Sequence, residues 1–228
     1  MKNLDWYHGF FYLTNDIRQL RHLKQYSHRL IVDIKCGLPK HSILDFARLG
    51  HHTDDVAVLP TVHTLILRHC WIIDVSNLGN IHTLDLSYTR VLNVGNLGNV
   101  HTLDLSHTKV KDVSMLGNVR DLDLSYTRVV DVSMLGNVES LSLRGTKVVD
   151  VSMLGNVRWL NLSKTEVVDV SMLGNVYMLD LENTKVEDVS NLTNVNTLYI
   201  EGSRVKVRDI TMLGNVPFID IRPMKLFV

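Results

Sequence analysis

Leucine recurs at intervals of 19 residues through most of this 228-residue chain. The recurring residues are Leu65, Leu84, Leu103, Leu122, Leu141, Leu160, Leu179 and Leu198, and Ile219 follows after 21 residues. The longer last interval reflects a two-residue insertion, Lys206 and Val207. A fixed period of this kind is typical of solenoids, in which each unit packs only on its neighbours. We therefore expect one elongated core rather than two globular ones.

Each unit divides into a strand and a return segment. In the unit that starts at Val119, the stretch "DLDLS" alternates polar and apolar residues, which predicts a half-buried strand with Leu122 and Leu124 inward. After Thr127 the apolar residues follow at irregular gaps, so the return segment has room for only a single helical or 3-10 turn. Six inward apolar side chains are too few to offset the ordering of a whole unit, so the units should fold only when stacked.

Two details of the return segment are also predicted. We expect Gly136 and Asn137 to supply left-handed backbone conformations that turn the chain toward the next strand. We expect Asp131 and Ser133 to cap the amides of the short turn.

The spacing Val119-x-x-Leu122-x-Leu124-x-x-Thr127-x-Val129 resembles the leucine-rich repeat signature, Leu-x-x-Leu-x-Leu-x-x-Asn-x-Leu, over residues 62–222. The resemblance implies a leucine-rich repeat solenoid with one parallel β-strand per 19-residue repeat and short non-helical or 3-10 return segments. The usual Asn is replaced by Cys70, Thr89, Thr108, Thr127, Thr146, Thr165, Thr184 and Ser203, small polar residues that suit bonds to neighbouring backbone.

This period is shorter than the usual 20–29 residues, which leaves no room for a helix on the convex side. A right-handed parallel β-helix is a competing architecture. The phrase "LGNVHTLDLS" is also similar to leucine-rich repeats encoded by large DNA viruses of protists, which is a hint about origin.

Three segments are expected along the chain. Residues 1–42 form an N-terminal cap with a helix over 15–30 and a strand over 29–35, residues 43–222 form the solenoid, and residues 223–228 form a covering tail. The aromatic cluster at Trp6, Tyr7, Phe10, Phe11 and Tyr12 is expected to plug the N-terminal end of the core. An alternative for this region is a divergent F-box, which would make the protein a ubiquitin-ligase adaptor.

Composition narrows the class of partner and the compartment. Lys plus Arg equals Asp plus Glu at 24 each, so no global field would collect nucleic acid or an anionic membrane. The first residues make a poor signal peptide, and no apolar run reaches membrane-spanning length. Cys36 and Cys70 are too few for a disulfide framework. We expect an intracellular protein that is not secreted.

The outward strand positions vary among units while the "LGNV" corner hardly changes, which is typical of a recognition surface on a fixed frame and also of drift on an exposed face. We favour recognition. The candidate partner-binding residues on the concave sheet face are Asp85, Asp104, Asp123, Arg144, Trp159, Asn161, Met178, Asp180 and Tyr199. Trp159, Met178 and Tyr199 are the expected anchor, with Arg144 close by.

Other columns of equivalent residues have simpler interpretations. Asp85, Asp104 and Asp123 would be stacked at about 4.8 Å. Repulsion between neighbouring carboxylates at that spacing costs only about 0.8 kcal/mol in water. Solvation and hydrogen bonds from the flanking serines are enough to accommodate the charges, so no cation is required. The column His63, His82 and His101 stands with no Cys or carboxylate at zinc-ligand spacing, so we expect surface histidines and no metal. A basic column of Arg90, Lys109, Arg128 and Lys147 is expected to neutralise the carboxylates. Met115, Met134, Met153, Met172 and Met212 are expected to be partly buried.

No catalytic motif is present: the sequence lacks a phosphate-binding glycine loop, a His-Glu-x-x-His pair and a nucleophile elbow. We therefore predict a non-catalytic module that needs no cofactor and binds a protein partner on the concave sheet face, as a monomer. The alternative is a structural or self-assembling component, for example of a particle, that associates through an edge, the methionines or the aromatic N-terminus.

Overall fold

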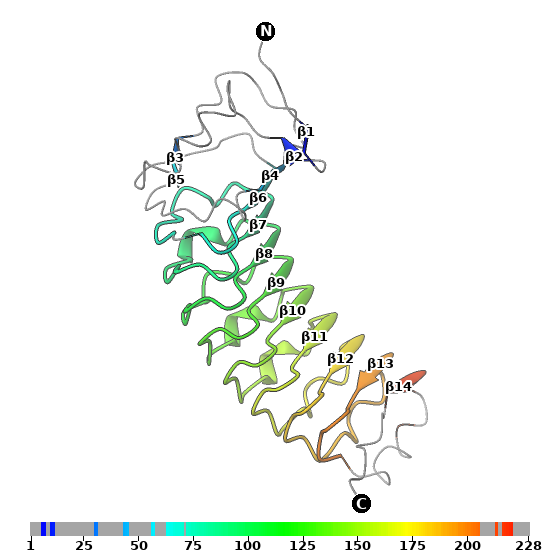
Figure 1. Ribbon diagram of the computed structural model, residues 1–228. Helices are drawn as coiled ribbons and strands as arrows, with labels where there is room; N and C mark the ends of the chain where they lie inside the picture. Colours follow the sequence, from blue (N-terminus) through cyan, green and yellow to red (C-terminus); the bar gives the residue numbers. More distant parts are fainter. Residues whose placement is uncertain are drawn as a thin grey trace, which may run out of the picture.

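A computed structural model of the chain describes residues 63–70, 72–205, 213 and 216–220, together with the backbone of short strands at 6–7, 10–11, 30–31, 43–45 and 56–57. The described residues form a coil with one strand per turn, and the strands line one side of it (Figure 1). This is the leucine-rich repeat solenoid that the sequence predicts. No helix in the described part is long and apolar enough to cross a membrane.

The main sheet contains ten parallel strands among the described residues, in the order of the sequence. They are β4 (Ile43–Asp45), β6 (Thr64–Ile66), β7 (Thr83–Asp85), β8 (Thr102–Asp104), β9 (Asp121–Asp123), β10 (Ser140–Ser142), β11 (Trp159–Asn161), β12 (Met178–Asp180), β13 (Thr197–Tyr199) and β14 (Phe218–Asp220). Equivalent residues pair across the sheet, so Leu103 lies opposite Leu122 and Leu122 opposite Leu141. Every outward side chain therefore belongs to a column that runs along the coil.

In the described part of the chain, four short strands lie outside this sheet. β1 (Trp6–Tyr7) pairs antiparallel with β2 (Phe10–Phe11), and β3 (Leu30–Ile31) pairs parallel with β5 (Val56–Ala57). β3 lies within the strand expected over 29–35, and β4 begins at the residue where the solenoid was expected to begin. The expected helix over 15–30, the aromatic plug, the F-box alternative, the insertion at Lys206 and Val207 and the tail over 223–228 lie outside the described residues or depend on side chains that are not described.

The core is one continuous column of apolar side chains. In the unit that starts at Val119, the inward residues are Val119, Leu122, Leu124, Val129, Val132 and Leu135, all 0–3% exposed. The strand shows the expected alternation, because Leu122 is buried between the half-buried Asp121 and Asp123. The predicted division of each unit into inward and outward residues is confirmed.

Return segments contain at most one 3-10 turn, as predicted. Three are assigned within the described residues: η1 (Gly95–Leu97), η2 (Ser133–Leu135) and η3 (Ser152–Leu154). The carboxylate of Asp131 accepts a hydrogen bond of 3.0 Å from the amide of Ser133, and Asn93 accepts one of 3.1 Å from the amide of Gly95. The expected capping by Asp131 is confirmed, whereas Ser133 supplies the capped amide and is not itself a second cap.

The expectation that Gly136 and Asn137 adopt left-handed conformations is wrong, since Asn137 has no positive φ either. The φ of Gly136 is −63° and its ψ is −14°, a right-handed helical conformation that any residue can adopt. Glycine is needed here because a Cβ would lie 2.5 Å from the carbonyl oxygen of Met153 in the next turn. Gly155 has the same relation to Met172. These glycines allow successive turns to approach each other closely.

Left-handed residues occur instead shortly after each strand from β6 to β13. The non-glycine examples are His69, Tyr88, His107, Tyr126, Lys164 and Asn183, with φ between 55° and 61°. Four of them carry rings that stack face to face, with centroids 4.2–4.6 Å apart. Gly145 follows Tyr126 in this column, and a Cβ on Gly145 would lie 2.5 Å from the Tyr126 ring. The glycine therefore makes room for the last ring of the stack.

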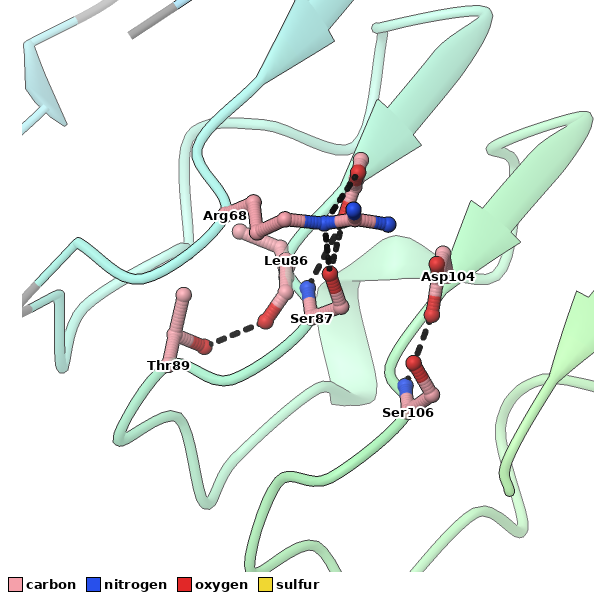
Figure 2. Close-up of polar contacts among 7 residues, drawn as sticks. Arg68, Leu86, Ser87, Thr89, Asp104 and Ser106 are labelled. Atoms are coloured by element: carbon pink, nitrogen blue, oxygen red, sulfur yellow. Dashed lines mark hydrogen bonds and ion pairs between the residues drawn. The ribbon is translucent and has the colours of Figure 1, made fainter. Parts of the chain in front are cut away.

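The threonine column closes a turn inside each unit. The hydroxyl of Thr127 donates a 2.6 Å hydrogen bond to the carbonyl of Leu124, and Thr89 bonds Leu86 in the same way at 2.7 Å (Figure 2). Ser203 repeats the contact with Ile200 at 2.7 Å. A hydroxyl group is sufficient for this bond, which explains why Thr or Ser can replace Asn here, although the bond is within the unit and not to its neighbour.

The methionine column differs from the expected partial burial. Met115, Met134, Met153 and Met172 are 60–64% exposed. The expectation failed because a side chain next to a buried Leu in a single-turn segment points outward, away from the neighbouring turns.

Gly136→Ala should lower the free energy of unfolding by about 1–3 kcal/mol, because the new methyl group must displace a backbone carbonyl. Gly95→Ala is the matched control: its Cβ meets nothing closer than 3.5 Å, and alanine favours the helical turn by up to about 1 kcal/mol. Urea denaturation followed by circular dichroism measures both. Equal losses in the two variants would contradict the close-approach role of Gly136.

Candidate binding surface on the sheet face

The structure places the predicted candidates in the expected columns. Asp85, Asp104 and Asp123 are direct partners on adjacent strands. Trp159 pairs with Met178 on β11 and β12. In the neighbouring column the partners are Asn161, Asp180 and Tyr199, which are half-buried side chains of the same sheet face.

The acidic column is tied to the backbone at the end of each strand. The Asp85 carboxylate accepts hydrogen bonds from the amide and hydroxyl of Ser87 at 2.9 and 2.6 Å. Asp104 accepts the Ser106 amide at 2.8 Å, and Asp123 accepts the Ser125 amide at 2.7 Å. Figure 2 shows this arrangement at two successive turns. The interpretation that the flanking serines satisfy these carboxylates is confirmed.

Arg68 adds a cation to the start of this column. Its Nε donates to the hydroxyl of Ser87 at 3.0 Å and lies 3.5 Å from the Asp85 carboxylate (Figure 2). Asp104, one turn further on, is held by Ser106, and burial raises the pKa of its carboxyl, to which the charges of Asp85 and Asp123 add. Burial also raises the pKa of Asp180. At Asp104 and Asp180, burial therefore disfavours the charged form of the carboxyl.

The charge of the column is not needed for the fold. Asn161 occupies the same position and accepts the amide and hydroxyl of Ser163 at 2.9 and 2.7 Å, the same two bonds that Asp85 makes. An amide oxygen is therefore an adequate cap. The aspartates at the other turns contribute charge that the frame does not require.

An aromatic cluster occupies the C-terminal half of the face. The guanidinium of Arg158 lies 4.8 Å from the centre of the Trp159 ring and 5.4 Å from that of Tyr177. Tyr199 meets Phe218 edge to face, with ring centres 6.1 Å apart. Phe218 is 50% exposed. The side chains expected to form the anchor are gathered here, together with three that were not among the candidates.

Arg144 does not contact this cluster. Its Nε donates to the hydroxyl of Tyr126 at 3.1 Å, and its Nη1 donates to the hydroxyl of Ser163 at 3.0 Å. The hydrogen bond from Arg144 lowers the pKa of the Tyr126 hydroxyl. The cation beside the indole is Arg158, which lies one residue before the strand. That position carries a polar or aromatic residue in every unit from His63 to Asn196, and this pattern was the available sequence sign that it belongs to the surface.

The column before the strands is a chain of contacts. The rings of His63, His82 and His101 stack at 4.3 and 4.4 Å. Arg120 Nε follows with a 2.7 Å hydrogen bond to Glu139, whose other oxygen lies 4.0 Å from Arg158. Within the described residues, no three metal-ligating side chains are grouped to hold an ion. The histidines are thus stacked surface residues rather than separate solvated ones.

The sheet face as a whole is acidic although the chain is neutral. The count covers four described positions of each unit from residue 63 onward: the residue before the strand, the two outward strand residues and the residue two positions after the strand. At these positions Asp and Glu outnumber Arg by nine to four, and Lys is absent. The acidic residues are Asp85, Asp104, Asp121, Asp123, Glu139, Asp180, Glu182, Glu201 and Asp220, and the basic ones are Arg68, Arg120, Arg144 and Arg158. This surplus favours a partner with a basic surface.

Asp104→Asn should raise the free energy of unfolding at neutral pH, because the variant keeps the Ser106 cap and loses an unfavourable charge. A raised pKa in the folded state means that the parent protein loses stability as pH rises from the ordinary value of 3.8 through the folded value. The advantage of the variant should therefore grow across that window and vanish below it. Urea denaturation of both proteins between about pH 3 and pH 7 measures this; an advantage that shrinks with rising pH would contradict it.

Comparison with solved structures supports the fold. The model is similar to internalin InlF from Listeria monocytogenes at 19% identity and a TM-score of 0.58, covering 71% of this chain and 61% of that one. The functional domain of InlJ from the same organism matches at 17% identity and a TM-score of 0.59, with 92% and 53% covered. Internalin C2 from Listeria monocytogenes matches at 24% identity and a TM-score of 0.54, with 64% and 74% covered.

This chain thus spans between about half and three quarters of the length of these neighbours. At this level of identity the likeness concerns the fold alone. No family model and no curated protein matches the sequence. The chain adopts a leucine-rich repeat solenoid and shares that fold with the internalins.

Proposed function

We propose that this protein is a non-catalytic module that binds a protein partner on its sheet face. The observation that carries the proposal is the cluster of Trp159, Met178, Tyr199 and Phe218, which gathers large side chains on an outward surface of a fixed frame. Aromatic and arginine side chains dominate the free energy of protein interfaces. The core and the hydrogen-bonded ladder do not require them, because other turns carry Thr or Ser at the positions of Trp159 and Phe218.

The partner that suits this face has basic residues around an apolar anchor. The surplus of carboxylates would repel phosphate groups, so we propose a protein and not a nucleic acid. The sequence also lacks the motifs of nucleophilic, metal and phosphate chemistry, which favours binding over catalysis.

Location and origin remain proposals. We propose an intracellular protein because two cysteines in 228 residues do not make a disulfide-stapled extracellular solenoid. Origin in a large DNA virus rests on the resemblance of the repeat phrase alone. Fractionation of the source cells with an antibody against the chain would place it, and recovery from the medium would contradict the intracellular location.

Trp159→Ala should weaken partner binding by about 2 kcal/mol, or about thirtyfold, while leaving the fold intact, because the side chain faces outward. Partners are first captured from the source lysate with the full chain and identified by mass spectrometry, and each candidate's affinity is then measured. Ile73→Ala, which removes an exposed side chain from a return segment, is the matched control. A partner lost by Ile73→Ala and retained by Trp159→Ala would contradict the sheet-face proposal.

A further inference from the structure

Exposed apolar side chains also line the return side of the coil, in two columns. One column holds Val130, Val149 and Val168, which are 53–58% exposed, and the other holds Met115, Met134, Met153 and Met172, which are 60–64% exposed. Between them runs a column of five aspartates: Asp112, Asp131, Asp150, Asp169 and Asp188. We call these three columns the return-face patch.

The fold does not require the residues of this patch. The flanking turns carry Asn96 and Asn191 at the methionine position, and Lys111 and Glu187 at the valine position. Asn93 caps its turn with a neutral oxygen, as described above. Polar, charged and neutral alternatives are therefore all compatible with the frame. Exposed apolar residues also occur at the valine position of the N-terminal turns, at Ile73 and Leu92, but Lys111 separates them from Val130. Asp74 likewise occupies the aspartate position, and Asn93 separates it from Asp112.

In the central turns, the charged side chains beside the patch make no ion pair with other described residues. A basic column lies two residues before the valines, and within the described residues neither its members Lys109, Arg128 and Lys147 nor the five aspartates form an ion pair. The next turns differ, because Lys185 lies 3.3 Å from Glu166 and Arg204 lies 3.9 Å from Glu187. Pairing is satisfied inside the chain at the C-terminal turns and not at the centre.

We propose that the return-face patch is the contact between two copies of this chain, packed side by side with parallel solenoid axes. A two-fold axis along the coil reverses the lateral order of the columns and keeps their axial spacing. The basic column of one copy then lies against the aspartate column of the other, turn for turn, and the valines meet near the axis. Turning the second copy end to end would instead oppose basic column to basic column.

The expected contact is small. Five turns at about 4.8 Å span roughly 20–25 Å, and a patch of similar width buries on the order of 1,000 Å² over both copies, near the low end for specific interfaces. The dimer should therefore dissociate in the micromolar range and weaken as salt screens the charge pairs. Both sheet faces point away from the contact, so the proposal does not depend on what the sheet face binds. The proposed dimer differs from the monomer expected from the sequence, and the experiment below decides between them.

Sedimentation velocity of the full chain between about 1 and 200 μM tests the proposal, with a reversible, salt-sensitive dimer expected. Val149→Asp should weaken the dimer at least about tenfold, because it buries a charge opposite its own copy. Ile73→Asp is the matched control: Ile73 lies in the same column, is 56% exposed and is outside the patch. This variant should dimerise as the parent does.

A charge exchange separates the electrostatic contact from simple apolar association. Arg128→Glu with Lys147→Glu should also weaken the dimer about tenfold, since it sets acid against acid. Glu166 shows that this column accepts glutamate without loss of the fold. Adding Asp131→Asn and Asp150→Asn to the same chain should recover part of the affinity, because the caps persist and the repulsion is removed.

Circular dichroism confirms that each variant folds. A parent that stays monomeric at about 200 μM overturns the proposal. So does a dimer that Val149→Asp and the charge variants leave unchanged, or one that Ile73→Asp weakens as much as Val149→Asp does. Binding of a lysine-rich peptide by a strictly monomeric chain would likewise overturn it and assign the patch to a different partner.

Discussion

The close approach of successive turns is the constraint on which the rest of this structure depends. At Gly136 and its equivalents the backbone of one turn lies so near the carbonyl of the next that a Cβ would collide with it. Together with the one-to-one pairing of the strands, this contact fixes the axial spacing of every turn. The buried leucines and valines can then stack on their own equivalents, and a single apolar column replaces the separate cores that such short units could not sustain.

Regular spacing has a consequence for the surface. Equivalent side chains of successive turns are neighbours, so each outward position of the repeat becomes a column whose members interact. Stacked histidines, the ring column that ends at Gly145, the Arg120–Glu139–Arg158 chain and the capped aspartates are all products of this geometry. A substitution at one turn is therefore felt mainly along its own column, which lets the sheet face and the return face change independently.

Much of this could be predicted from the sequence because the period of 19 residues defines the columns directly. The alternation around Leu122 and Leu124 predicts which side chains of the strand face inward, and the pairing of Trp159 with Met178 follows from the register. The period does not predict which way side chains point in the return segment, because polar and apolar residues no longer alternate there. The exposure of Met134 was missed for this reason.

The role of Gly136 was misinterpreted because a left-handed turn and a close backbone approach both select glycine. Only the φ and ψ angles and the distance to the next turn distinguish the two. The hydrogen-bond partners of Arg144 were not predicted, for a different reason. A long side chain reaches partners in other columns, here Tyr126 and Ser163, and sequence distance does not predict which of them it will choose.

The central claim is that whole turns, and not individual contacts, are the structural units, because register and close approach repeat with the period. Removing residues 101–119 deletes one full period and joins Val100 to Arg120, so every column closes up in register. Removing residues 102–119 deletes one residue fewer, so one extra residue precedes the strand at the junction. If the strand keeps its pairing, the side chains that should face inward then face outward. Denaturant unfolding followed by circular dichroism should show a single cooperative transition with a slightly lower m-value for the first deletion. The second deletion should lose most of its stability. Equal stability of the two proteins, or failure of the full-period deletion to fold, would contradict this account.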